Sequence, residues 1–171
     1  MGNVAFVTAT PQTQSLILMQ RGDTNYLREG DQITLKNMTW RIHMAINTAE
    51  QNPVTGRFVL IYDRRPSGAQ AAWGDVYNNT SIVSLLSLAE DTKGRFQVLH
   101  DQMWTFATGG TETQMEKGFI DLKNKRVLYN ANAGAIGDVQ QGNLFAAFFF
   151  LGNNSNVIVN GYLRVRFVND N

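Results

Sequence analysis

Residues 38–46 read M-T-W-R-I-H-M-A-I, and every even-numbered position in this stretch is apolar. Polar side chains, Arg41 among them, occupy the odd positions 39, 41 and 43. A period of two is typical of a β-strand with one buried face. Just upstream the apolar positions are odd, at Ile33 and Leu35. The pattern therefore changes face near Lys36, which predicts a β-bulge or a strand break there.

Similar segments follow along the rest of the chain, separated by turns that contain Gly, Asn or Lys. They cover residues 57–63, 95–106, 112–122, 126–130, 143–151 and 162–168, with weaker candidates at 15–19 and 135–139. Residues 80–89 have instead the composition of a short helix that begins at a threonine or serine. Many short strands and at most one brief helix predict an all-β protein, an antiparallel sandwich of two sheets.

The run F-A-A-F-F-F at residues 145–150 lacks the alternation of the other strands. A continuous apolar run of this length is typical of a strand that is covered on both faces. One face belongs to the core. The other is covered either by the same chain or by a neighbouring subunit.

The composition limits the function classes open to the chain. Its 171 residues fit one domain, it has no cysteine, and fifteen basic against fourteen acidic residues leave a net charge of +1. Disulfide frameworks and thiolate metal sites are therefore excluded, and any nucleic-acid binding has to come from a local patch. No apolar run approaches the about 18 residues that span a bilayer, so we expect a soluble protein with no membrane partner.

Patterns of catalysis and metal binding are missing from the sequence. His43 and His100 are the only histidines, fewer than the about three protein ligands of a catalytic zinc site. No nucleophile elbow, Walker loop or EF-hand pattern is present. We therefore expect no enzyme activity, cofactor or metal.

A set of short motifs spans nearly the whole chain. In order they are R-E-G-D-Q-I from Arg28, R-F-V-L-I-Y-D-R-R-P-S-G from Arg57, W-G-D-V-Y-N from Trp73, R-F-Q-V-L-H-D from Arg95, A-T-G-G from Ala107, R-V-L-Y-N from Arg126 and G-Y-L-R-V-R-F-V-N-D from Gly161. Taken together they resemble the coat proteins of geminiviruses and related small circular single-stranded DNA viruses. The first motif is also similar to the R-x-G-D stretch of satellite plant virus coats.

The resemblance implies an eight-stranded viral jelly roll, with strands lettered B to I in chain order and sheets B-I-D-G and C-H-E-F. On this scheme the strands are B 33–46, C 57–63, D 95–106, E 112–122, F 126–130, G 135–139, H 143–151 and I 161–168. The implied function is self-assembly, from pentamers, into an icosahedral shell around a circular single-stranded DNA genome. The implied location is the virion, and the host nucleus or cytoplasm during assembly.

Residues 1–31, ahead of the expected first strand, depart from the family pattern. Geminivirus-type coats carry a strongly basic N-terminal arm, whereas the first arginine of this sequence is Arg21. The basic arm is thus absent from this segment. Either it has been removed, or DNA is packaged by the inner wall of the shell.

Two groups of basic residues are candidates for contact with the genome. Arg41 on the expected strand B, and Arg164 and Arg166 on strand I, would lie on one outer sheet face because these strands pair in a jelly roll. Lys36 joins them if the bulge turns it that way. The second group is a basic turn made of Lys123, Lys125 and Arg126. Clustered cations suit phosphate, although a solvated strand face and a solvated hairpin remain the alternatives.

The long loop after residue 63 carries the candidates for subunit contacts, since the family makes such contacts there. The candidates are Arg64, Arg65, Pro66, Trp73 and Tyr77. The alternative function for such a sandwich is a module that binds a ligand or a carbohydrate on a sheet face. Uniform hollow particles distinguish the two, because only a coat protein forms them.

Overall fold

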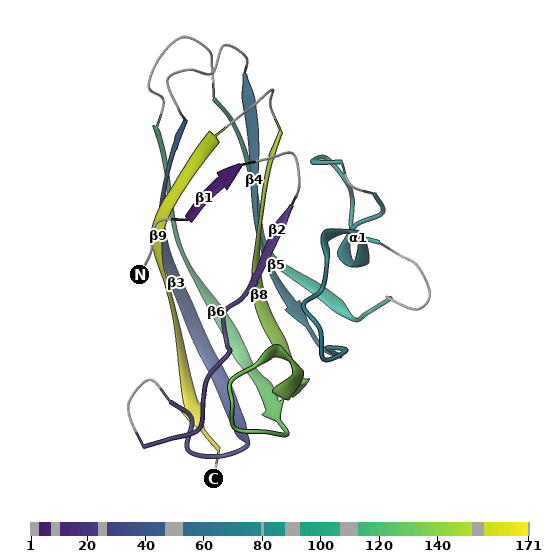
Figure 1. Ribbon diagram of the computed structural model, residues 1–171, viewed down its shortest axis with the longest axis vertical. Coiled ribbons are helices and arrows are strands. Elements are labelled where there is room, and N and C mark those ends of the chain that lie inside the picture. Colours follow the sequence, from purple (N-terminus) through teal and green to yellow (C-terminus); the bar gives the residue numbers. More distant parts are fainter. Residues whose placement is uncertain are drawn as a thin grey trace.

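Two antiparallel β-sheets face each other in the computed structural model, which describes residues 4–7, 11–23, 27–46, 53–79, 81–87, 93–106, 113–151 and 156–170 (Figure 1). The first sheet has five strands in the order β1 (Val4–Val7), β9 (Asn156–Asn169), β3 (Gln32–Ile46), β6 (Thr113–Tyr129) and β7 (Val139–Gln141). The second has four, in the order β2 (Gln12–Ser15), β8 (Asn143–Leu151), β4 (Val54–Asp63) and β5 (Phe96–Phe106).

The strand order is that of a jelly roll. If the three-residue strand β7 is set aside, the remaining strands in chain order are B to I. The first sheet then reads B-I-D-G and the second reads C-H-E-F. The predicted all-β fold with these two sheets is therefore confirmed.

The predicted lettering of the strands is wrong and is corrected here. Residues 4–15 supply strands B and C, because β1 pairs with β9 and β2 pairs with β8. The stretch expected to be B is therefore D. The segments expected as E and F are one strand, β6, which continues through Lys123 and Asn124 with positive φ angles of 51° and 56°. The K-N-K sequence thus makes a bulge within a strand, where a hairpin was expected.

The predicted change of face near Lys36 is confirmed. The register of β3 against both neighbours shifts between Leu35 and Asn37. Lys36 Nζ donates a hydrogen bond to the side-chain oxygen of Asn124 in the bulge of β6, at 2.8 Å. Facing bulges on neighbouring strands keep Leu35 and Met38 both on the buried side of the sheet.

The predicted helix at residues 80–89 is wrong for its described part, residues 81–87, which make turns. Ser84 Oγ donates to the main-chain oxygens of Asn79 and Ser81, and such side-chain bonds compete with a helix. The helical turn of this loop is instead α1 (Trp73–Val76). The weak strand expected at 135–139 is replaced by a 3-10 turn, η1 (Ile136–Asp138), followed by β7.

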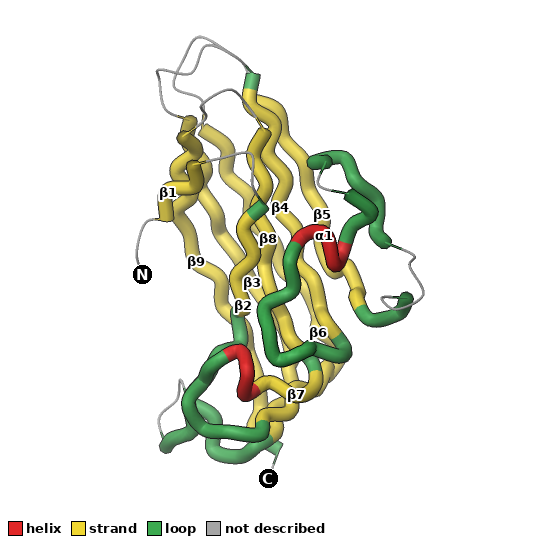
Figure 2. The backbone as a smooth tube through the Cα atoms, turned by 45° about the vertical axis from the view of Figure 1, so that its right-hand side comes forward, coloured by secondary structure: helices red, strands yellow, loops and turns green. Residues whose placement is uncertain are grey.

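The apolar side chains form two clusters on opposite faces of the second sheet. Leu144, Ala146 and Phe148 of β8 point into the core between the sheets, and Phe145 and Phe149 point outward. The loop with α1 lies over this outer face and covers it (Figure 2). The double-sided burial predicted for residues 145–150 is confirmed, with the cover supplied by the same chain.

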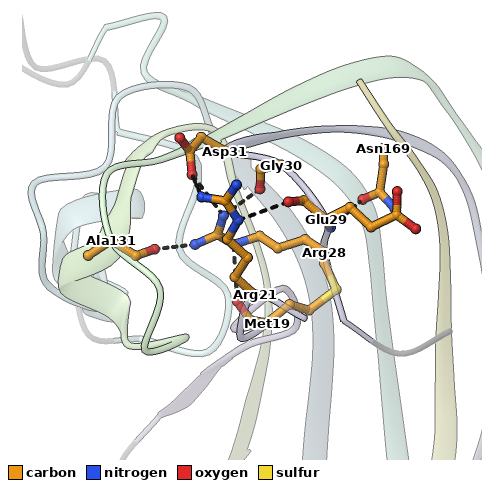
Figure 3. Close-up of polar contacts among 8 residues, drawn as sticks. All are labelled: Met19, Arg21, Arg28, Glu29, Gly30, Asp31, Ala131 and Asn169. Atoms are coloured by element: carbon orange, nitrogen blue, oxygen red, sulfur yellow. Dashed lines mark hydrogen bonds and ion pairs between the residues drawn. The ribbon is translucent and has the colours of Figure 1, made fainter. Parts of the chain in front are cut away.

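The R-E-G-D motif forms a corner before β3 in which Arg28 is buried and Glu29 and Asp31 are exposed (Figure 3). The fully buried guanidinium of Arg28 donates to the main-chain oxygens of Met19, Gly30 and Ala131. Its carbon lies 4.2 Å from the centre of the Tyr129 ring, and Asp31 supplies a carboxylate at 3.3 Å. The arginine of this motif therefore closes the turn before β3 and has no surface for a partner.

Candidate nucleic-acid interface

The outer face of strands β9, β3 and β6 is the uncovered face of the sandwich. Strand pairing orders its side chains in rows that run across the three strands. From one end these rows are Arg166, Asn37 and Asp121; Arg164, Thr39 and Phe119; Tyr162, Arg41 and Lys117; and Asn160, His43 and Met115. The two middle rows line an open hollow of about 970 Å³. We call the exposed side chains of these four rows the basic sheet face.

Arg41, Arg164 and Arg166 lie together on the basic sheet face and are exposed. The neighbourhood expected for them is therefore present, because β3 pairs with β9 whatever letters the strands carry. Within the described part of the chain, no ion pair joins any of the three to a carboxylate. Their charges face solvent and are available to an anionic ligand.

Sequence reasoning missed Lys117, Phe119 and Tyr162 on the same face. Lys117 is directly opposite Arg41, and like charges at such a cross-strand pair are destabilising. Phe119 and Tyr162 expose 64% and 68% of their surfaces between the cations. The alternation of residues 115–121 could have predicted that the odd-numbered side chains face outward. It could not have predicted which residues of β3 lie opposite them.

The second basic group is divided between two sides of the sheet. Arg126 is exposed on the outer face, opposite Thr34, and Lys123 is exposed at the bulge. Lys125 turns inward, with its Nζ 5.2 Å from the centre of the Tyr62 ring. Burial, with Arg64 and Lys123 nearby, lowers the pKa of Lys125 below its ordinary value. Lys125 therefore belongs to the edge of the core and not to the basic sheet face.

Asp170 offsets part of the charge beside the bulge. Hydrogen bonds from Thr34 and then Gln32 lower the pKa of Asp170, and the charges of Arg126 and Lys36 act in the same direction. Lys36 is also half-buried and bonded to Asn124. Lys36 and Arg126 are therefore less available than the three arginines in the rows.

Comparison with known families decides the identity of the chain. A model of the geminivirus coat protein/nuclear export factor BR1 family matches residues 3–170. The chain belongs to this family. Its function is that of a capsid protein, a structural role located in the virion, and no finding favours the alternative of a ligand-binding module.

Other comparisons add little to the family match. The coat protein is similar to a chain of the structure titled "Cryo-EM Atomic Structure of Broad Bean Stain Virus (BBSV)", at 13% identity and a TM-score of 0.38, over 98% of this chain and 88% of that chain. The fold assignment rests on the strand pairing given above. No curated protein matches the chain. In the residues that the structure describes, no helix is long and apolar enough to cross a membrane, and no three His, Cys, Asp or Glu side chains group as metal ligands.

The long loop of the coat protein begins at an ion pair that is mostly buried. Arg95 Nε and Nη2 donate to the two carboxylate oxygens of the buried Asp63, at 2.9 and 2.8 Å. The next residues, Arg64 and Arg65, are exposed and reach the main-chain oxygens of residues 94 and 93, each at 3.4 Å. Pro66 is half-buried. Arg64 and Arg65 thus lie on the surface, as a role in subunit contacts requires.

Trp73 and Tyr77 lie inside the coat protein subunit and not on its surface. Their rings stack on each other, with centroids 4.2 Å apart, and both are buried. The Arg57 guanidinium lies 5.3 Å from the Trp73 ring and 4.6 Å from the Tyr77 ring. Burial raises the pKa of Tyr77 well above its ordinary value. The two aromatic residues predicted at the interface therefore pack over the Arg57 guanidinium inside the subunit. They are shielded from a neighbouring copy.

Arg57 joins this loop to the second sheet. Its Nε and Nη2 donate to the carboxylate of Asp101 on β5, at 2.8 and 2.5 Å. Its Nη1 donates to the main-chain oxygens of Ile82 and Ser84, at 2.6 and 2.9 Å. The bonds to Asp101 raise the pKa of Arg57 against the opposing effect of burial. Arg57 thus holds the main chain of residues 81–87 against the second sheet.

Proposed function

We propose that this coat protein, as a single jelly-roll domain, assembles from pentamers into a closed icosahedral shell around circular single-stranded DNA. The basic sheet face lines the inside of the shell and holds the DNA. One observation carries this proposal: cations without a carboxylate partner among the described residues alternate with exposed aromatic rings on one face. The residues are Arg41, Lys117, Arg164, Arg166, Phe119 and Tyr162.

This pattern fits a single strand better than a duplex. Proteins that bind single strands combine a positive groove along the phosphates with aromatic rings on which unpaired bases stack. Each phosphate that meets a cation releases about one counterion, which favours binding at low salt. A phosphate between Arg41 and Lys117 would also remove the repulsion between them.

The other sheet supports the same orientation. The loop with α1 covers its outer face over β4 and β8 and buries Val59, Ile61, Phe145 and Phe149, whereas part of β5 stays exposed (Figure 2). The basic sheet face is uncovered. A shell subunit needs one surface for the genome and other surfaces for its neighbours. The uncovered basic sheet face is the surface available for the genome.

The test replaces Arg164 and Arg166 together by glutamate. We expect purified particles to carry much less nucleic acid, seen as a lower ratio of absorbance at 260 nm to that at 280 nm, with an unchanged far-UV circular dichroism spectrum. The control is Lys93→Glu, at an exposed position away from the basic sheet face, compared with Arg164→Glu alone so that the change of charge is equal. An unchanged ratio in the first variant, or an equal loss in the control, contradicts the proposed DNA face.

Particle formation separates the two roles named in the family description. Size-exclusion chromatography with negative-stain microscopy is expected to show uniform hollow particles. Free subunits that bind DNA and never close into particles would favour a role as a nuclear export factor. In either role we expect the protein in the host nucleus or cytoplasm before the virion is complete.

A further inference from the structure

We infer that residues 81–87 bind a second copy of this chain through the side chains of Val83 and Leu85. The inference rests on the proposed assembly into a shell, and it names one contact that holds the copies together. It concerns a different side of the molecule from the basic sheet face.

The segment alternates between buried and exposed side chains. Ile82 and Ser84 are buried against the loop and the second sheet, whereas Val83 exposes 67% of its surface and Leu85 76%. In the described residues these are two of the most exposed large aliphatic side chains. They stand two positions apart, and the buried Ser84 lies between them.

The backbone under these two side chains is firmly held. Arg57 binds the main-chain oxygens on either side of Val83, those of Ile82 and Ser84, and is itself buried. The Leu85 oxygen accepts a hydrogen bond from the Asn78 amide at 3.1 Å, and the Ser87 amide donates to the Val76 oxygen at 2.7 Å. A contact made by side chains on an ordered backbone loses little further conformational entropy on binding.

The chemistry of the segment selects a protein partner. Residues 76–89 contain no charged side chain, so the segment has no cation to attract phosphate. Depletion of charge around exposed aliphatic side chains is typical of the centre of a protein interface. A coat protein has copies of itself as its obligatory protein partner, and the loop is the outermost layer over the second sheet. A second copy of this chain is therefore the occupant that fits.

Crosslinking tests this contact directly, because the chain has no native cysteine. Leu85→Cys, labelled with a benzophenone maleimide and irradiated under assembly conditions, is expected to give covalent dimers whose second peptide comes from another copy. The control is Met115→Cys, whose native side chain is 68% exposed on the basic sheet face. We expect at least tenfold less dimer from this position. No dimer from the Leu85 position while particles form overturns the inference.

A second variant pair measures what the contact does. Val83→Ser with Leu85→Ser is expected to remain folded by circular dichroism and to lose most particles in size-exclusion chromatography, whereas Leu18→Ser, at an exposed position outside both surfaces, keeps them. Equal particle yield in the double variant contradicts the contact and leaves the shell proposal standing. Dimers through the Leu85 probe without closed particles support the contact and contradict the shell.

Discussion

Arg41 and Lys117 face each other across β3 and β6 without an intervening carboxylate. Lys117→Glu turns this repulsion into an attraction and is expected to stabilise the free protein by about 0.2–1 kcal/mol. The same change should weaken binding of a fluorescent oligothymidine and flatten its salt dependence, since one phosphate contact is lost. Urea unfolding and fluorescence polarisation measure the two effects. Opposite signs for stability and affinity distinguish a binding residue from a structural one.

The control for this prediction is Lys93→Glu, at an exposed position of the long loop. It makes the same change of charge away from the basic sheet face. Equal losses of affinity in both variants would mean that only the net charge of the protein affects binding. The position of Lys117 opposite Arg41 would then have no role in DNA binding.

Phe119 and Tyr162 are the two exposed rings of the basic sheet face. Because base stacking contributes about 1–3 kcal/mol per base, Phe119→Ala should weaken oligothymidine binding by about tenfold and leave its salt dependence unchanged. Tyr162→Ala should behave likewise. Met115→Ala, on the same face but without a ring, is the control and should change the affinity little. A change in salt slope for Phe119→Ala would argue against stacking.

At the scale of elements, the long loop depends on one arginine. Arg57→Met keeps much of the volume and removes the donors to Asp101, Ile82 and Ser84. We expect a loss of about 2–3 kcal/mol in the free energy of unfolding, because hydrogen bonds to a charged group contribute about that much. The fluorescence emission of Trp73 should shift to the red, because its buried ring becomes exposed to water when the loop loosens. Arg65→Met, at an exposed arginine, should cost less than about 0.5 kcal/mol.

Elements with strong internal patterns could be predicted from the sequence. The alternation at residues 38–46 marked one face of β3, the change of parity marked the bulge at Lys36, and the aromatic run marked β8 as covered on both faces. Each of these follows from side-chain periodicity alone. The pairing of β3 with β9, and with it the grouping of Arg41, Arg164 and Arg166, came from the jelly-roll resemblance.

Elements defined by their partners could not be predicted. Strand β2 reads Q-T-Q-S and has no apolar period; main-chain pairing with β8 makes it a strand. Lys117 opposes Arg41 because of register, which no local pattern contains. The burial of Trp73 and Tyr77 depends on how the loop folds back on Arg57. These features come from contacts distant in sequence, and they decided both the lettering of the strands and the candidate sites.

At the scale of the whole molecule, three buried tyrosines make the stability of the fold depend on pH in the alkaline range. Burial raises the pKa of Tyr62, Tyr77 and Tyr129 above their ordinary value of 10.0. The folded chain then keeps protons that the unfolded chain releases. Stability is therefore complete below pH 10 and falls as the pH rises above it, by up to about 1.4 kcal/mol per pH unit for each tyrosine.

Urea unfolding between pH 8 and pH 11.5, followed by circular dichroism and by tyrosinate absorbance at 295 nm, checks this expectation. Most tyrosinate should appear together with unfolding above pH 10. Tyr162→Phe, at an exposed position, should leave the pH dependence unchanged. Complete ionisation of all tyrosines in a protein that stays folded would contradict the assignment.

The placement of β1 and β2 has a consequence for the order of events in the cell. Val4 pairs with Val159, and Gln12 pairs with Phe148, so β1 and β2 are synthesised long before the strands with which they pair. Such high contact order slows folding. Neither sheet can therefore be completed before β8 and β9 have been synthesised.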